Sequence, residues 1–322
     1  VGTLQATTNA GGIFLLESNA LIIGATAVQT TANNAPIEIT LTAGDLTLQD
    51  DITAHGSGTV TLAVLGADAS LITGDGDDDI ASTSGAISIT ADRLALDTGT
   101  ISSSGALTLQ PNDAAETVGV SGGAGNFALS TAEIDLLTNG FSSITIGRSD
   151  STALMTINAD AFLDPITFRM GGVSGDITTA GALTTTNLSM TFTAGTGNSG
   201  VFTQGDGSST IATGSGAIIV NADTIALSTT ANTVTTTGAI TLQPNTAGRP
   251  IVIGAAGGVG DLALSVAEIA ALTDNASGIT IGKADSGAVT ISAITFNDPI
   301  TILGAAMSVT ALQAATNNIT LT

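Results

Sequence analysis

Short segments in which apolar residues alternate with Thr or Ser recur along most of the chain. Examples read PIEITLTA from residue 36, TVTLAVLG from residue 59, AISITA from residue 86 and ALTLQ from residue 106. Alternation with a period of two is typical of strands that bury one face, and the Gly, Asn, Asp and Ser residues between the segments indicate turns. The segments follow one another about every 8 to 12 residues. We therefore expect an all-β chain of many short strands.

One phrase departs from this pattern and occurs twice. It reads ALSTAEIDLLTNG over residues 128–140 and ALSVAEIAALTDN over residues 263–275. Ser130 stands three positions before Glu133, which is the spacing of a capping box, and Asn139 with Gly140 provides a stop signal. The phrase therefore predicts one short helix in each of its two copies.

The helix phrase belongs to a longer internal repeat. GAISITADRLAL at residue 85 returns as GAIIVNADTIAL at residue 216, GALTLQPN at 105 returns as GAITLQPN at 238, and DPITF at 164 returns as DPITI at 298. The order is preserved at a spacing of about 133 residues, which indicates a duplicated unit. We expect a partial unit over 1–84, a first unit over 85–215 and an incomplete second unit over 216–322. TLQATTN at residue 3 and ALQAATN at residue 311 suggest one continuous rod that is a fragment of a longer chain.

Short strands that repeat over such a distance favour a parallel β-solenoid, because stacked coils can be duplicated with their loops intact. At about 20 residues per coil the chain would form about 16 coils, with one helical excursion per unit. Strands of successive coils would lie about 4.8 Å apart. Aromatic residues make up only 2% of the chain, with no Trp and no Tyr. We expect an aliphatic interior in which coils approach too closely for aromatic rings.

Composition narrows the range of functions. The chain has 27 acidic and five basic residues, a formal net charge of -22, so nucleic acid and anionic membrane surfaces are poor partners. It has no cysteine, which excludes disulfides and thiolate catalysis. No apolar run approaches the length of about 18 residues that a membrane span needs. We expect no membrane span.

The acidic stretch TGDGDDDI over residues 73–80 is similar to the calcium-binding nonapeptide of RTX repeats. It makes Asp75, Asp77, Asp78 and Asp79 candidate calcium ligands, although one loop offers fewer than the six to eight oxygens that calcium takes. The second copy reads QGDGSSTI from residue 204 and lacks three of the carboxylates. A calcium loop and a solvated acidic turn are therefore both open, and no other cofactor is expected.

The helix phrase also has two interpretations. Its apolar residues could cover an open edge or corner of the solenoid, or the helix could project as a contact for a partner or a neighbouring rod. The candidate contact residues are Glu133, Leu136, Leu137, Glu268 and Leu272.

Catalysis has little support in the sequence. His55 is the only histidine, and no nucleophile or metal-ligand pattern lies near it. Paired carboxylates that act on polysaccharides would need the Tyr, Trp, Arg or Lys residues that bind sugars, and these are scarce here. We expect no enzymatic activity.

The phrases GALTLQPN, SSITIGR and DPITI, set in an acidic Gly/Thr/Ala-rich array, resemble the repeat region of filamentous-haemagglutinin-like bacterial exoproteins. The resemblance implies a right-handed parallel β-helix that is exported by two-partner secretion and serves adhesion, biofilm or surface fibres. We expect a structural rod or fibre segment of an extracellular adhesin or filament on the bacterial cell surface. Its expected partners are copies of itself or neighbouring repeats, or a cell-surface glycan or receptor. The alternatives are a calcium- or glycan-binding β-helical module and, less favoured, a polysaccharide-active enzyme.

Overall fold

The computed structural model of the chain describes residues 2–74, 76, 78–197, 199–314 and 317–322. Short strands follow one another along the chain, and the described strand pairs within each of the two units defined below are parallel. Within these described ranges, helix is confined to two single turns, α1 (Thr131–Ile134) and α2 (Val266–Ile269). The predictions of an all-β chain and of a parallel solenoid-like stack are confirmed.

Contacts divide the chain into two compact units. Unit 1 comprises residues 1–147 and 163–165, and unit 2 comprises residues 148–162 and 166–322. In each unit the chain passes in turn through three stacks of parallel strands, which form three faces. The term rung denotes the position of one strand in the stack of a face.

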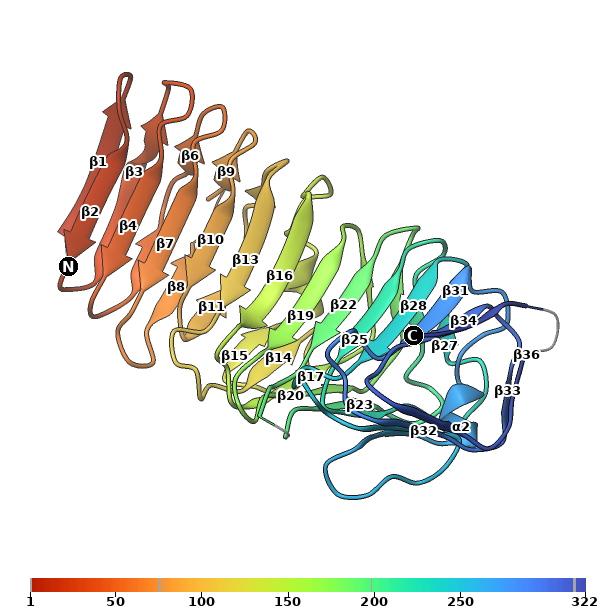
Figure 1. The fold of residues 1–322 in the computed structure, drawn as a ribbon. Coiled ribbons are helices and arrows are strands. Elements are labelled where there is room, and N and C mark those ends of the chain that lie inside the picture. Colours follow the sequence, from red (N-terminus) through yellow and green to blue (C-terminus); the bar gives the residue numbers. More distant parts are fainter. Residues whose placement is uncertain (1, 75, 77, 198, 315–316) are drawn as a thin grey trace. The chain divides into compact units, whose positions relative to one another are not determined.

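The first face of unit 1 is formed by one central strand from each coil (Figure 1). Its strands are β2 (Ile13–Glu17), β4 (Ile37–Leu41), β7 (Val60–Val64), β10 (Ile87–Thr90), β13 (Ala106–Gln110) and β16 (Ser143–Arg148). Register places Ile37, Val60, Ile87, Leu107 and Ile144 in one column. All five side chains are buried, so alternating apolar residues of successive coils form a continuous aliphatic core.

The other two faces of unit 1 share the long strand β3 (Leu21–Thr30), which pairs with β1 (Gly2–Thr8). The first half of β3 begins the second face, which continues through β5 (Leu46–Leu48), β8 (Ser70–Thr73) and β11 (Arg93–Ala95). Its second half begins the third face, which continues through β6 (Ile52–Ala54), β9 (Ile80–Ser82) and β12 (Ile101–Ser102).

Unit 2 repeats this plan. Its first face holds β19 (Ile166–Met170), β22 (Met190–Thr193), β25 (Ile218–Asn221), β28 (Ala239–Gln243), β31 (Gly278–Ile281), β34 (Ile300–Ile302) and β37 (Ile319–Leu321). The second face begins with β17 (Leu154–Ile157), β20 (Asp176–Thr179), β23 (Val201–Gln204) and β26 (Thr224–Ala226). The third begins with β18 (Asp160–Phe162), β21 (Leu183–Thr185), β24 (Ile211–Ala212) and β27 (Val234–Thr235).

The core of unit 2 contains aromatic rings, which corrects the expectation of a purely aliphatic interior. Phe168, Phe192 and Phe202 are fully buried. Ring centroids are 5.4 Å apart between Phe168 and Phe192, and 4.8 Å apart between Phe192 and Phe202. Phe168 and Phe192 are register partners on adjacent strands. Phe168 and Phe192 stack, whereas Phe192 and Phe202 are tilted, so rings fit between coils at a centroid spacing close to that of neighbouring strands.

Each helix follows a backward step of the chain on the second face. In unit 1, β14 (Val118–Val120) pairs with β15 (Phe127–Leu129), and the later strand β15 lies against β11. In unit 2, β29 (Ile251–Ile253) lies between the later strand β30 (Leu262–Leu264) and β32 (Val289–Ile291), while β30 contacts β26. On the second face, the earlier strand of each pair (β14 or β29) thus leaves one rung empty, and the later strand (β15 or β30) occupies that rung.

Because of this backward step, the second face of unit 2 has one rung more than the first face over the same coils. Between β26 and β32 lie two strands, β30 and β29, whereas β28 alone lies between β25 and β31 on the first face. On the third face, residues 271–273 follow β27 through the bridge between Val234 and Leu272. The next strand there, β33 (Ile294–Phe296), pairs with β36 (Leu312–Ala314) but forms no ladder with the described residues on the β27 side. The third face is therefore interrupted beside α2. The second face ends with β35 (Met307–Val309).

Candidate functional site: a groove on the third face of unit 2

The predicted calcium stretch is only partly described by the structure. Asp75 and Asp77 lie outside the described residues. Asp78 is buried, and its carboxylate accepts a hydrogen bond of 2.5 Å from the backbone N–H of Gly74. The Asp79 carboxylate accepts from the N–H of Thr100 at 2.6 Å and from its hydroxyl at 2.8 Å. Both described carboxylates thus hold turns of the backbone in place.

The second copy forms its turn with hydroxyls. Ser209 stands in the place of Asp78 and is also buried. Asp206 accepts from both the hydroxyl and the N–H of Ser208, which hold its pKa below the ordinary value. The part of the chain that the structure describes contains no group of three or more His, Cys, Asp or Glu side chains that could hold a metal.

The helix residues of unit 1 are engaged within their own unit. Glu133 accepts from the N–H of Ser130 at 2.8 Å and, through its other oxygen, from the N–H of Leu96 at 3.0 Å. The Ser130 hydroxyl in turn accepts from the Glu133 N–H, so the predicted capping box is confirmed. The carbonyl of Leu136 accepts from Ile101, and Leu137 is buried against it through a strand bridge. The glutamate therefore fastens the helix to the end of β11.

The second copy repeats these contacts. Glu268 closes the capping box with Ser265 and accepts from the N–H of Leu227 at 3.2 Å, just beyond β26. Leu272 is buried and bridges to Val234. Val266, at the first position of α2, is 54% exposed. Outward contact by this helix would therefore involve Val266 more than Glu268 or Leu272.

Buried aspartates are a feature that the sequence interpretation did not single out. Asp92 accepts from the N–H of Asp68 at 3.0 Å and of Asp113 at 3.0 Å, and its repeat partner Asp223 accepts from the N–H of Thr246 at 2.7 Å. Asp164 and Asp298, from the two DPIT phrases, accept from the N–H of Gly140 and Asn275. The signal was present in the repeated phrases, because both copies keep an aspartate at each place.

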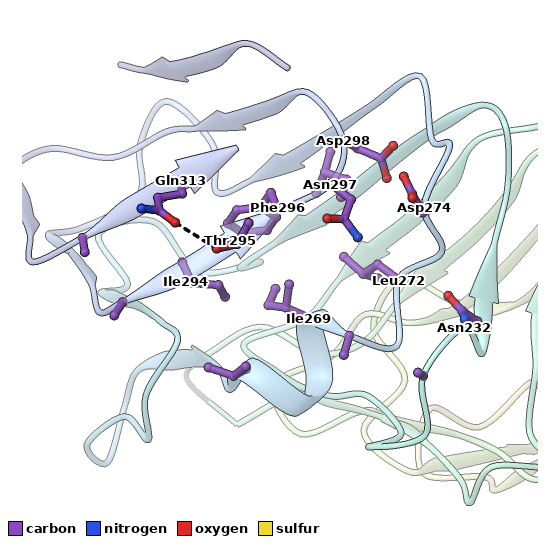
Figure 2. A pocket seen from close by; sticks show the side chains of 16 residues that line it. Asn232, Ile269, Leu272, Asp274, Ile294, Thr295, Phe296, Asn297, Asp298 and Gln313 are labelled. Atoms are coloured by element: carbon purple, nitrogen blue, oxygen red, sulfur yellow. Dashed lines mark hydrogen bonds between the residues drawn. The ribbon is translucent and has the colours of Figure 1, made fainter. Parts of the chain in front are cut away.

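The interruption of the third face leaves a groove of about 690 Å³ in unit 2. Its walls are α2 with residues 271–273 on one side and β33 on the other, and Figure 2 shows Ile269 and Leu272 lying below β33. Ile269, Leu272 and Ile294 supply apolar surface, each about 7% exposed. A concave apolar site of this size is within the usual range for ligand sites.

The rim of the groove is polar and acidic. Asp274, Asn297 and Asp298 gather at one end in Figure 2, while Thr295 and Gln313 contact each other at the other end. Asn232 lies below the acidic end. None of the described residues that line the groove is basic. The groove thus combines an apolar floor with hydrogen-bonding groups and a negative potential.

Sequence reasoning missed the groove because its walls come together only through the backward step. Asn232, Asp274 and Thr295 are far apart in sequence and belong to no motif. The first copy has Asn139 in place of Asp274 and Ala161 in place of Thr295, so the repeat gave no signal either.

Comparisons with known proteins name no relative. No family model matches the chain, and neither a curated protein nor a solved structure matches it. Neither helix among the described residues is long and apolar enough to cross a membrane.

Proposed function

We propose that the chain is a structural segment of a bacterial surface fibre or adhesin, a right-handed β-helical rod of about 16 coils. In this role the solenoid spaces or assembles other parts of a secreted protein outside the cell, and its own sides carry no catalysis. Its assembly partners are copies of itself or neighbouring repeats.

The observation that carries the proposal is what the two copies keep in common. The shared carboxylates, represented by Asp92 and Asp223 or by Glu133 and Glu268, accept hydrogen bonds from backbone N–H groups in both copies. Buried N–H groups need such partners, so these residues stabilise the coils. Exposed polar residues at the groove differ between copies. Duplication has therefore preserved the scaffold and not a ligand set.

The extracellular location rests on the resemblance to filamentous-haemagglutinin-like exoproteins, together with the acidic, cysteine-free composition. An acidic surface resists adsorption to anionic lipids and nucleic acid, which suits an exposed spacer.

The test is negative-stain electron microscopy of the purified chain, with and without a chelator. We expect elongated particles of uniform width in both conditions, either as single rods or joined into fibres. Round particles, or elongated particles that collapse in the chelator, would contradict the proposal of a self-sufficient structural rod.

An activity screen distinguishes the competing class. The chain is incubated with neutral and acidic polysaccharides, and release of reducing ends or unsaturated products is measured. We expect no release above that of heat-unfolded protein. Turnover that is lost in a variant of an acidic residue would replace the structural proposal with an enzymatic one.

A further inference from the structure

The groove exposes one edge of strand β33. The N–H of Ile294 donates to the carbonyl of Ala311, so the backbone groups of Ile294 face β36. Backbone groups of successive residues in a strand point to opposite edges, so the N–H and C=O of Thr295 face the groove. Within the described chain, β33 has no strand partner on that side. Such an edge is a template for pairing with another strand.

The opposite wall offers a second edge. Ala271 accepts from the N–H of Val234, and the N–H of Thr273 donates to the carbonyl of Val234, so these groups face β27. The same alternation directs the carbonyl of Leu272 toward the groove. The second face carries an additional rung at this level and the third face does not. The groove therefore lies where an additional rung of the third face would lie.

The negative charge of the groove favours an occupant that carries positive charge. Asp274 is exposed on the rim, Asp298 lies beside it, and none of the described lining residues carries a positive charge. At this groove a second copy of the chain is a poor occupant, because its five basic residues offer few positive charges to meet Asp274. A segment with Lys or Arg near its ends is attracted.

We propose that an extended, basic segment of another polypeptide binds in this groove as an added rung, pairing with the Thr295 edge of β33. Main-chain hydrogen bonds supply affinity, alternate apolar side chains cover Ile269 and Leu272, and the basic residues meet Asp274. This site is independent of the structural role proposed above, because a rod with or without such a partner remains a rod.

The probe is an acetylated and amidated hexapeptide, Lys-Thr-Ile-Thr-Val-Lys, titrated into the folded chain by calorimetry. Two control peptides carry Glu in place of both Lys residues, or N-methyl groups on both Thr residues. Hydrogen exchange of the native protein is followed in parallel. We expect the probe to slow exchange at the Thr295 amide, with little change at the Ile294 amide, which is already bonded to Ala311.

Variants test the two sources of affinity separately. Thr295→Pro removes the N–H that faces the groove and leaves the Ile294 bond intact, and proline is tolerated on strand edges. We expect it to weaken probe binding about tenfold, the cost of about 1.4 kcal/mol in lost pairing. Asp274→Asn should weaken binding about threefold through lost attraction. Asp135→Asn removes the same charge at the helix of unit 1 and should leave binding unchanged.

Several results would overturn the proposal. Equal affinity of the N-methylated and parent peptides would show that backbone pairing is not used, and equal affinity of the Glu peptide would remove the charge argument. No binding of the parent peptide, or protection of Thr295 by cellotetraose and not by the peptide, would also refute it. If Thr295→Pro fails to fold by circular dichroism, the exchange experiment on the native chain decides.

Discussion

At the scale of single residues, the backbones of successive coils pack closely in unit 1 at the turn that leads into the first face. A Cβ placed on Gly85 would lie 2.1 Å from the carbonyl oxygen of Gly58. The hydroxyl of Ser82 donates to that carbonyl at 2.7 Å and accepts from the N–H of Gly85 at 2.9 Å. Ser103 makes the same pair of bonds with Gly85 and Gly105 one coil later. Small residues are thus required where coils meet at this corner.

Gly85→Ala is therefore expected to lower the free energy of unfolding by about 2 kcal/mol, because backbone must move to admit the methyl group. Gly11→Ala is the matched control, since its Cβ would meet nothing within 4 Å. Urea unfolding followed by circular dichroism measures both. Equal midpoints for the two variants would show that the corner relaxes freely.

The buried aspartates give a second prediction at this scale. Asp223 is fully buried and accepts from the N–H of Thr246 at 2.7 Å and from its hydroxyl at 2.5 Å. Asp223→Ala leaves these donors without their carboxylate, at a cost of about 2 kcal/mol in unfolding free energy. Asp206 makes the same pair of bonds to Ser208 at the surface, so Asp206→Ala should leave the unfolding midpoint unchanged. A similar loss in both variants would mean that burial does not set the cost.

At the scale of elements, each helix is a single turn, too short to be stable by itself. Its stability comes from the glutamate that closes the capping box and also accepts a hydrogen bond from the end of the preceding second-face strand. Glu133→Gln should lower the unfolding free energy by about 1 kcal/mol, because an amide offers one acceptor where two are used. Glu268→Gln should have a similar effect in unit 2.

Thermal and urea unfolding of these two variants is compared with Asp135→Asn, which changes an exposed carboxyl at the C-cap of α1, two residues after Glu133. The amide of Leu96 should also exchange faster in Glu133→Gln than in the parent chain. Unchanged exchange at Leu96 would show that the bond from Glu133 does not hold the end of β11.

The capping box was predictable because its residues are local, as were the strands, whose alternation is read directly from residues such as Ile37 and Ile39. The backward steps were not, since a segment such as residues 251–253 reads as the same strand whichever rung it occupies. The groove follows from such a step, which is why Thr295 and Asp274 carried no signal. The stacked Phe168 and Phe192 likewise depend on register between coils.

At the scale of the whole molecule, the charge imbalance outweighs its pairing. The described residues form three ion pairs, between Arg93 and Asp68, Arg148 and Asp150, and Lys283 and Asp285. In each pair the carboxylate side chain is more than half exposed, so each contributes at most about 1 kcal/mol. The remaining carboxylates repel one another, and salt at 0.1 M limits the range of this repulsion to about 10 Å. Repulsion should therefore dominate the response to salt.

We accordingly expect the urea midpoint to rise as NaCl is increased from about 10 to about 300 mM in the presence of a chelator, since screening weakens repulsion more than the three exposed attractions. Circular dichroism at each salt concentration measures the shift, and an unchanged or falling midpoint would contradict the argument. Calcium chloride at matched ionic strength, without chelator, tests whether the acidic turn that contains Asp79 binds calcium. A gain beyond that in NaCl, lost in Asp79→Ser, would favour calcium ligation there, whereas equal gains would leave Asp79 as a purely structural acceptor for Thr100.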